Sequence, residues 1–431
     1  MSALRSRRRP MRIAFFVHRF PVISEAFIMN AAIGLLRAGH EVDIYALHGP
    51  PSDKMRHGSL AKYANRWRCK TFTLRERPRQ RIALAPLATA KLLATHGRRA
   101  ARAWDARRFG TEGSSLVALH EASTFLRRGR YDILHCQFGT LADSVLNHRD
   151  AGFLSGRVIV HFRGYDISSH VQARGPAAYR GVFARADGFF TNCSFFARRL
   201  EQLGAPADRV TIVPSPIDLD LFRHRARHFS QRETLRVLCV GRLVEKKGFG
   251  FGLDAIAGLT RDGVDVSCQI IGDGPLRQSL QARAVELGIG GRVEFTGAAA
   301  HEQIAAALDR AHIFLAPSVT ASNGDQDASI NTLKEAMATG CPFVTTTHGG
   351  IPEMAEGLDA GVMAPEGDAG ALHIALRTLL DKREHWPEMG KRARAHIERS
   401  FSIQSTTGRA IAAYEEALSR APPQTRGLVL A

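Results

Sequence analysis

The run DASINTLKEAMATGCPFVTT occupies residues 327–346 and places two carboxylates, Asp327 and Glu335, eight residues apart. Apolar and small residues at helical spacing predict a helix that ends at Gly340 and is followed by a buried strand. Ser329 or a neighbour is expected to cap this helix. Glu335 is expected about two turns into it, within reach of the crevice at the strand ends, where parallel α/β sheets bind ligands. The two acids are therefore predicted to hold a polyhydroxyl ligand.

Strand patterns alternate with helix-length segments in two successive blocks. The first block opens with a strand at 11–17, a helix at 24–37 and a strand at 41–47. Strands are also predicted at 131–135, 157–161, 188–191, 210–213, 235–240, 266–272, 293–296, 313–316 and 341–346. Such alternation predicts an α/β protein with two doubly wound, Rossmann-like parallel-sheet domains.

The predicted organisation has five parts. A basic tail at 1–10 precedes an N-terminal domain at 11–215, and a polar linker at 216–234 leads to a C-terminal domain at 235–385. Two helices are predicted in the last segment, 386–431, which is expected to pack back toward the N-terminal domain. A chain of 431 residues is long enough for two or three domains with cores of their own.

Composition excludes several classes of protein. The chain is 45% hydrophobic and 23% charged, as in ordinary globular proteins. No window approaches twenty uninterrupted apolar residues, so no transmembrane helix is predicted. The arginine-rich start is followed by a strand and not by the apolar core of a signal peptide. The six cysteines show no zinc or disulfide spacing, which indicates a reducing, cytoplasmic setting.

Positive charge is concentrated in the first half of the chain. Residues 1–200 carry 34 Lys and Arg against 13 Asp and Glu, whereas residues 201–431 carry 25 against 28. Sixteen basic residues fall between Lys54 and Arg108, where a helix is predicted from about Arg81. Such a field attracts a polyanion: an anionic membrane surface, a nucleic acid or a pyrophosphate-linked substrate. A solvated helical face is the alternative, and no nucleic-acid-binding motif is present.

Two glycine-containing turns follow strands of the second block. In the turn at 241–248, Gly241 lets the backbone approach a ligand, while Arg242 and Lys247 supply cations for a pyrophosphate. The turn Gly272-Asp-Gly274-Pro ends the next strand and opens a helix, a place where backbone N–H groups meet phosphates. A plain tight turn explains it equally well.

Three other motifs each have a competing explanation. The glycines at 248–252 are not a dinucleotide fingerprint, because no strand directly precedes them. Asp325 and Asp327 have the spacing to grip Mg²⁺ with a diphosphate, but the cations at 242 and 247 make a metal unnecessary. The run at 347–353, THGGIPE, is either a ligand-approaching loop or a structural turn.

Polar residues also follow three strands of the first half. If these strand ends meet at one crevice edge, they form a site for an acceptor molecule. A lone histidine at a strand end is more often structural. The residues expected at this acceptor side are Ser24, Glu25, His135, His161, Arg163 and Asp166.

Together these motifs resemble the family 4 glycosyltransferases, retaining enzymes of the GT-B architecture, in which two Rossmann-like domains face a central cleft. The resemblance covers nearly the whole chain, is strongest from Arg236 to Glu353, and is to members that build exopolysaccharides and lipid-linked glycans. It implies that Glu335 binds the ribose of a nucleotide, that Asp327 contacts the transferred sugar, and that Arg242 and Lys247 bind the diphosphate.

The same resemblance sets the expected substrates and location. It implies a nucleotide-sugar donor, a glycan or lipid-linked acceptor, no metal or other cofactor, and a cytoplasmic protein whose basic half contacts the inner membrane surface. Asp327, Arg242 and Lys247 are the expected catalytic residues. The other donor-binding residues are expected to be Gly241, Gly272, Gly274, Ser329, Ile330 and Asn331.

The chain departs from the family pattern at three positions. Asp327 stands where a glutamate is usual, which shortens the reach by one methylene group. Arg163 stands in place of the histidine of the usual H-G-x-D motif, and Pro216 replaces a common glycine of the interdomain segment. A sugar-nucleotide epimerase or hydrolase of the same architecture, or a basic nucleic-acid-binding protein, remains an alternative function.

Overall fold

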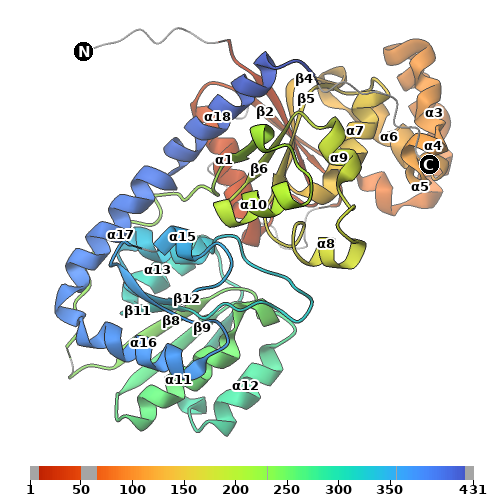
Figure 1. Ribbon diagram of the computed structural model, residues 1–431. Helices are drawn as coiled ribbons and strands as arrows, with labels where there is room; N and C mark the ends of the chain where they lie inside the picture. The colour runs from red at the N-terminus through yellow and green to blue at the C-terminus, as the bar shows by residue number, and fades with distance from the viewer. Residues whose placement is uncertain (1–8, 50–65, 231, 356, 423–431) are drawn as a thin grey trace, which may run out of the picture.

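The computed structural model describes residues 9–49, 66–230, 232–355 and 357–422. These residues form two α/β domains, each built on its own parallel sheet (Figure 1). The predicted pair of doubly wound parallel sheets is confirmed. The predicted tail at 1–10 and part of the basic stretch at 54–65 lie largely outside the described residues.

The N-terminal sheet has seven parallel strands in the order β3-β2-β1-β4-β5-β6-β7. The order reverses between β1 and β4, and a reversal of this kind leaves a crevice at the carboxyl ends of the two strands. The strands are β1 (Arg12–Val17), β2 (Glu41–Ala46), β3 (Trp67–Thr71), β4 (Arg130–Cys136), β5 (Ser155–Phe162), β6 (Gly188–Thr191) and β7 (Val210–Ile212).

The C-terminal sheet has six parallel strands in the order β10-β9-β8-β11-β12-β13. Its order reverses between β8 and β11, so it offers a second crevice of the same kind. The strands are β8 (Leu235–Val240), β9 (Val266–Ile271), β10 (Val293–Gly297), β11 (Ile313–Ala316), β12 (Phe343–Thr346) and β13 (Gly361–Ala364).

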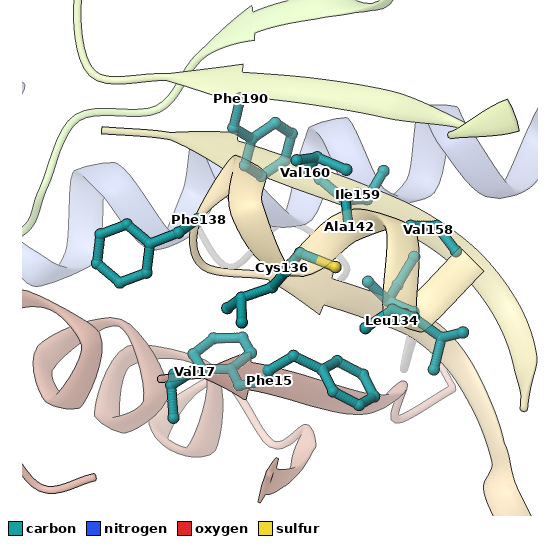
Figure 2. Packing of buried hydrophobic residues seen from close by; sticks show 14 of the residues in the cluster. Phe15, Val17, Leu134, Cys136, Phe138, Ala142, Val158, Ile159, Val160 and Phe190 are labelled. Atoms are coloured by element: carbon teal, nitrogen blue, oxygen red, sulfur yellow. The ribbon is translucent and has the colours of Figure 1, made fainter. Parts of the chain in front are cut away.

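Helices cover both faces of each sheet, which explains why the central strands are apolar without alternation. In the N-terminal domain, β1, β4 and β5 supply the middle of the core, where Phe15, Leu134 and Val160 are fully buried (Figure 2). The helices of this domain are α1 (Ala26–Arg37), α3 (Pro78–His96), α4 (Ala106–Phe109), α5 (Thr111–Ser114), α6 (Val117–Thr124), α7 (Ala142–Asp150), α8 (Ser169–Arg174), α9 (Arg180–Arg185) and α10 (Ser194–Gln202).

The C-terminal sheet separates two cores. One lies against α11 (Phe249–Arg261), α12 (Arg277–Glu286) and α16 (Ala369–Asp381). The other lies against α13 (His301–Arg310), α14 (Asn331–Thr339) and α17 (Trp386–Ser400). A short helix, α15 (Pro352–Ala355), completes the domain.

A helical excursion between β3 and β4 has a small core of its own. Leu92 of α3 is fully buried there with Leu119 of α6 and Phe153. Figure 1 shows α3 to α5 in orange at the edge of the N-terminal domain that lies away from the C-terminal domain. The helix predicted from about Arg81 to Arg108 is shorter, because α3 ends at His96 and a 3₁₀ segment (Gly97–Trp104) follows.

The chain crosses between the domains twice, and the two crossings lie side by side. The backbone N–H of Ile217, in the first crossing, donates to the carbonyl of Phe401 in the second, and Ile217 forms a parallel bridge with Ser402. The last helix, α18 (Ile403–Ser419), then packs on α1, and its Tyr414 is buried in the N-terminal core. Among the described residues, no helix is long and apolar enough to cross a membrane.

Candidate functional site

A cavity of about 610 Å³ lies between the two domains, at the crevices of both sheets. Its wall on the C-terminal side comes from the turns after β8 and β9 and from the start of α14. Its wall on the N-terminal side comes from the start of α1 and the turn after β5. Of the predicted site residues, those that line it are Ser24, Glu25, Arg163, Gly241, Arg242, Lys247, Gly272, Asp327, Ser329, Ile330, Asn331 and Glu335.

Asp327 is bound by two lysines. Its Oδ2 lies 2.8 Å from Lys247 Nζ, and its Oδ1 lies 3.3 Å from Lys246 Nζ. Burial alone would raise the pKa of Asp327, but the two ammonium groups hold that pKa well below its ordinary value. The carboxylate is therefore charged at any physiological pH.

Lys246 was missed by the sequence prediction. It is buried, and its Nζ also lies 3.0 Å from Asp325 Oδ2, so it is held between two carboxylates. The signal was the doubled lysine at 246–247, of which only Lys247 was assigned a role. Asp325 and Asp327, the two acids with the spacing of a magnesium pair, are thus bridged by a lysine side chain.

Glu335 and Ser329 present unpartnered polar atoms to the cavity. Glu335 Oε2 and Ser329 Oγ are buried and have no hydrogen-bond partner within the described part of the chain. Burial raises the pKa of Glu335 to about 8, and its Oε1 lies 3.9 Å from His301 Nε2. A buried polar atom without a partner is costly, and a ligand hydroxyl group would remove that cost.

The start of α14 differs from the prediction. The helix begins at Asn331 after Ile330, and no side chain caps it, so the expected cap at Ser329 is wrong. Because the first N–H groups of a helix lack intrahelical acceptors, the end of α14 in the cavity favours an anion. Glu335 lies little more than one turn into the helix and still faces the cavity.

Two glycines let the turns after β8 and β9 pack closely. A Cβ on Gly272 would lie 1.8 Å from the carbonyl oxygen of Gly241, and one on Gly274 would lie 2.6 Å from that of Leu243. The N–H of Leu243 donates to Asp273 O at 2.9 Å. Gly274 does not line the cavity, so it fixes the shape of the turn from behind.

Arg242 is exposed toward the cavity. Its guanidinium makes no hydrogen bond or ion pair with any residue that the structure describes, in contrast to the ammonium groups of Lys246 and Lys247. A cation that the fold itself does not use is available to a ligand, and a planar guanidinium suits phosphate oxygens.

Glu25 and Arg163 form the polar part of the N-terminal wall. Burial raises the pKa of Glu25 to about 7, against the lowering effect of Arg163 and Arg242, and its Oε2 has no hydrogen-bond partner among the described residues. Arg163 donates to Gln137 Oε1 at 2.6 Å and to Ser215 Oγ at 3.2 Å, and it lies over the ring of Phe27. Burial lowers the pKa of Arg163 to about 9.

Three predicted acceptor-side residues do not reach the cavity. His135 Nδ1 lies 2.6 Å from Tyr414 Oη beneath α18, and His161 stacks on His135 and contacts Asn192. Asp166 accepts hydrogen bonds from the backbone N–H groups of Gly139, Arg163 and Gly164. The expectation that both histidines and Asp166 face the crevice is therefore not met. The three side chains bond to other parts of the fold, although His135 Nε2 and His161 Nδ1 are buried without a hydrogen-bond partner among the described residues.

Two segments of the C-terminal domain reach across the cleft. Asp325 Oδ1 accepts a hydrogen bond from Ser168 Oγ at 3.2 Å, and Gln326 Oε1 accepts one from Arg199 at 2.9 Å. Glu353 accepts hydrogen bonds from the N–H groups of Ser194 and Phe195 at the start of α10. The loop before Asp327 and the motif at 347–353 thus join the two domains.

Comparison with known proteins identifies the family to which this chain belongs. Residues 24–221 match the model described as Glycosyltransferase Family 4, and residues 234–382 match the model described as Glycosyl transferases group 1. The chain is 31% identical over 413 residues to the "Putative colanic acid biosynthesis glycosyltransferase WcaL" of Escherichia coli, covering 95% of this chain and all of that protein. The chain is a family 4 glycosyltransferase.

Two other similarities extend this assignment. The glycosyltransferase is 29% identical to the amylovoran biosynthesis glycosyltransferase AmsK of Erwinia amylovora, over 91% of this chain and 96% of that protein. A crystal structure of HepE from Anabaena, in complex with UDP and glucose, matches with a TM-score of 0.69 at 16% identity, over 94% of this chain and 99% of that chain. The predicted GT-B fold is confirmed.

Proposed function

We propose that this glycosyltransferase transfers a sugar from a nucleoside diphosphate sugar to a hydroxyl group of a glycan or lipid-linked acceptor, with retention, during exopolysaccharide assembly. The observation that carries the proposal is the meeting in one cavity of an unpaired Arg242, a lysine pair on Asp327, and an unpartnered Glu335. Cations suit a diphosphate, and buried carboxylate oxygens suit sugar hydroxyl groups.

The names of similar proteins support the two substrate classes. WcaL and AmsK are named for the biosynthesis of colanic acid and amylovoran, and the HepE structure holds UDP and glucose. This chain covers at least 96% of both named relatives, so the comparison extends to the whole of their length.

The proposed chemistry begins with the leaving diphosphate. Negative charge develops on it as the bond to the sugar breaks, and fixed cations stabilise that charge best in a cleft that excludes water. Arg242, Lys247 and the start of α14 are the groups proposed to do this. Lys247 can turn toward the phosphates without leaving Asp327 unpaired, because Lys246 still lies 3.3 Å from the other carboxylate oxygen.

The sugar and the acceptor complete the proposed reaction. Asp327 is proposed to contact the transferred sugar, where its charge stabilises the oxocarbenium-like centre. For retention, the acceptor hydroxyl group attacks from the face that the diphosphate leaves, and a diphosphate oxygen takes its proton. No metal is proposed to take part. In the described residues, no group of three or more His, Cys, Asp or Glu side chains is placed to hold one.

The donor site is tested with two variants and matched controls. Lys247→Ala is expected to lower turnover of a nucleotide sugar 10²- to 10³-fold. Glu335→Ala is expected to weaken nucleotide binding by about 10- to 100-fold, because it leaves a buried hydroxyl group of the ligand without its hydrogen-bond partner. The probes are UDP-glucose and GDP-mannose, with UDP and GDP for calorimetry. Lys391→Ala and Glu388→Ala, on the exposed face of α17, are the controls.

Two results would contradict the proposal. Unchanged turnover and unchanged nucleotide affinity in both site variants would exclude this donor site. Consumption of the donor at the same rate with and without any acceptor, with no glycoside formed, would instead identify a hydrolase or epimerase.

We also propose that α3 rests on an anionic membrane surface. Four apolar side chains of this helix are exposed: Ile82 and Leu87 by 69% and 68%, and Leu84 and Leu93 by 42% and 50%. Basic residues adjoin them, among them Arg79, Lys91 and, in the next turn, Arg98 and Arg99. Exposed apolar groups flanked by cations fit the boundary between lipid headgroups and acyl chains.

Sedimentation with vesicles tests this contact. The protein is expected to bind vesicles that contain the anionic lipid phosphatidylglycerol and to dissociate from them at high salt. It is expected not to bind vesicles of phosphatidylcholine alone. The double variant Ile82→Ser/Leu87→Ser is expected to lose binding. Ile374→Ser, which changes an equally exposed residue of α16, is expected to keep it. Binding that persists in the double variant, or that ignores lipid charge, would contradict the proposal.

A further inference from the structure

The loop after β12 holds the backbone of Asp327 from both sides. The N–H of Asp327 donates to His348 Nε2 at 3.1 Å, and the N–H of Gly350 donates to the carbonyl oxygen of Asp327 at 3.3 Å. Gly349 has φ +54°, and a Cβ there would lie 2.2 Å from that carbonyl oxygen. The glycines at 349 and 350 thus let the loop close onto this one residue.

His348 is held in one tautomer by its two contacts. Because Nε2 accepts the N–H of Asp327, the ring proton is on Nδ1, which donates to Glu366 Oε2 at 2.5 Å. The His348 side chain is fully buried. Glu366 also accepts from the N–H and the hydroxyl group of Thr320, at 2.8 and 3.0 Å. Thr320 lies in the loop that leads from β11 to Asp327.

Neither His348 nor Glu366 lines the cleft cavity. Glu366 lies instead beside a separate hollow bounded by Phe249 and Phe251. Any effect of the two residues on the reaction must therefore pass through residues that do line the cavity, of which His348 contacts Asp327.

The backbone of Asp327 is under competing constraints. Its carboxylate forms ion pairs with two lysines, and the two residues directly before it, Asp325 and Gln326, form hydrogen bonds with the opposite domain. When the domains move apart, those contacts pull on the loop. A contact inside the C-terminal domain is what can keep the carboxylate in place through that motion, since rigid support preserves catalytic geometry.

We propose that Glu366 and His348 are positioning residues that hold Asp327 against the transferred sugar. The inference rests on the proposed role of Asp327 in the donor site. It assigns the motif THGGIPE, together with a residue thirteen positions beyond it, to the rate of transfer and to the choice of sugar.

A pair of matched variants separates the two bonds of His348. In His348→Gln the amide oxygen takes the place of Nε2 and keeps the bond to Asp327. In His348→Asn the amide nitrogen takes the place of Nδ1, so the bond to Glu366 is kept and the bond to Asp327 is lost. We expect His348→Asn to lower kcat about 10- to 100-fold, the cost usual for such supporting contacts, and His348→Gln to retain most of it.

Two readouts distinguish positioning from general destabilisation. In an Asp327→Asn background, His348→Asn is expected to cause a much smaller loss, because coupled residues are not additive. Hydrogen exchange at the Asp327 amide, measured on the full chain without substrate, is expected to accelerate in His348→Asn and to stay slow in His348→Gln. If the variants of the buried His348 fold poorly, Glu366→Gln can be used in their place, because the Glu366 side chain is partly exposed.

The outcomes are distinct from those that test the proposed function. Equal loss of kcat in both backgrounds, or unchanged exchange at Asp327 in both His348→Asn and Glu366→Gln, would overturn the positioning role. If the wild-type protein turns over no nucleotide sugar, the proposed function fails, whereas the exchange experiment still decides whether the Asp327 backbone depends on His348.

Discussion

On the C-terminal side of the cleft, the predicted polar side chains face the cavity. On the N-terminal side, three of the six predicted side chains instead form hydrogen bonds with other parts of the protein. Arg242 and Glu335 keep unused polar groups toward the cavity. His135 is bonded to Tyr414, and Asp166 to three backbone N–H groups. Unused polarity beside a cavity indicates a ligand site, whereas satisfied polarity indicates structure.

Glu25 is an exception, because it is an N-terminal residue whose unpartnered polar atom faces the cavity. It lies on the N-terminal wall, and its Oε2 is as unpartnered as that of Glu335. The expected acceptor side is therefore narrower than the sequence predicted, and it centres on Ser24, Glu25 and Arg163.

The largest expected effect comes from Arg242→Ala. It should lower kcat by about 10²- to 10³-fold, because the diphosphate loses a fixed cation. The melting temperature should stay unchanged, since the guanidinium of Arg242 has no hydrogen bond or ion pair within the described chain. Steady-state kinetics and calorimetric melting measure the two effects. A fall in melting temperature with full activity would show that Arg242 stabilises the fold and does not bind the donor.

Glu335→Gln is expected to change the way in which the stability of the protein depends on pH. The pKa of Glu335 is raised to about 8 in the folded protein, so from about pH 4.5 upward the unfolded chain loses a proton that the folded protein retains. Wild-type stability therefore falls between about pH 4.5 and 8 by roughly 1.4 kcal/mol for each unit of pKa shift. Glu335→Gln lacks this slope. Urea unfolding at pH 5 and pH 8 measures the difference, and parallel pH profiles for the two proteins would contradict it.

On the N-terminal side, Tyr414→Phe is expected to cost about 1–3 kcal/mol of stability, because it leaves the buried His135 Nδ1 without its partner. Turnover by the folded variant should equal that of the wild type. Urea unfolding and kinetics on the same samples provide the measurement. A loss of turnover without a loss of stability would indicate that His135 contributes to the acceptor site.

The smallest expected effect is that of metal removal. Arg242 and Lys247 supply the positive charge that Mg²⁺ would otherwise bring to a diphosphate. Activity after EDTA treatment and gel filtration should therefore match that of the untreated protein. Recovery only upon addition of Mg²⁺ or Mn²⁺ would show that the cations of the C-terminal wall are not sufficient.

Most of the fold could be predicted because central strands are apolar and are followed by glycine or polar turns. Strands β6, β8 and β11 have the predicted bounds. The two strands that were missed, β3 and β13, are edge strands. β3 carries Arg68 and Lys70, whose charges hide the strand pattern, and β13 is only four residues long.

The site could be predicted where its residues directly follow strands of one sheet. Arg242 and Lys247 follow β8, and sheet topology brings them to Asp327. The histidines could not be predicted in the same way. The side-chain direction at a strand end depends on the last pleat, and the partner of His135 lies 279 residues away on α18. Lys246 and His348 act through contacts across loops, which leave no periodic signal in the sequence.

The adjacent crossings at Ile217 and Ser402 leave the two domains one convenient motion, a rotation about that point. In such a rotation, displacement grows with distance from the axis. Figure 1 shows α8 and its neighbouring loop at the opposite end of the interface from the junction of α17 and α18. The bond between Asp325 and Ser168, the residue directly before α8, therefore lies far from the junction, where such a rotation displaces the domains most. Opening of the cleft by such a rotation would therefore separate the few residues that immediately precede Asp327 from the N-terminal domain.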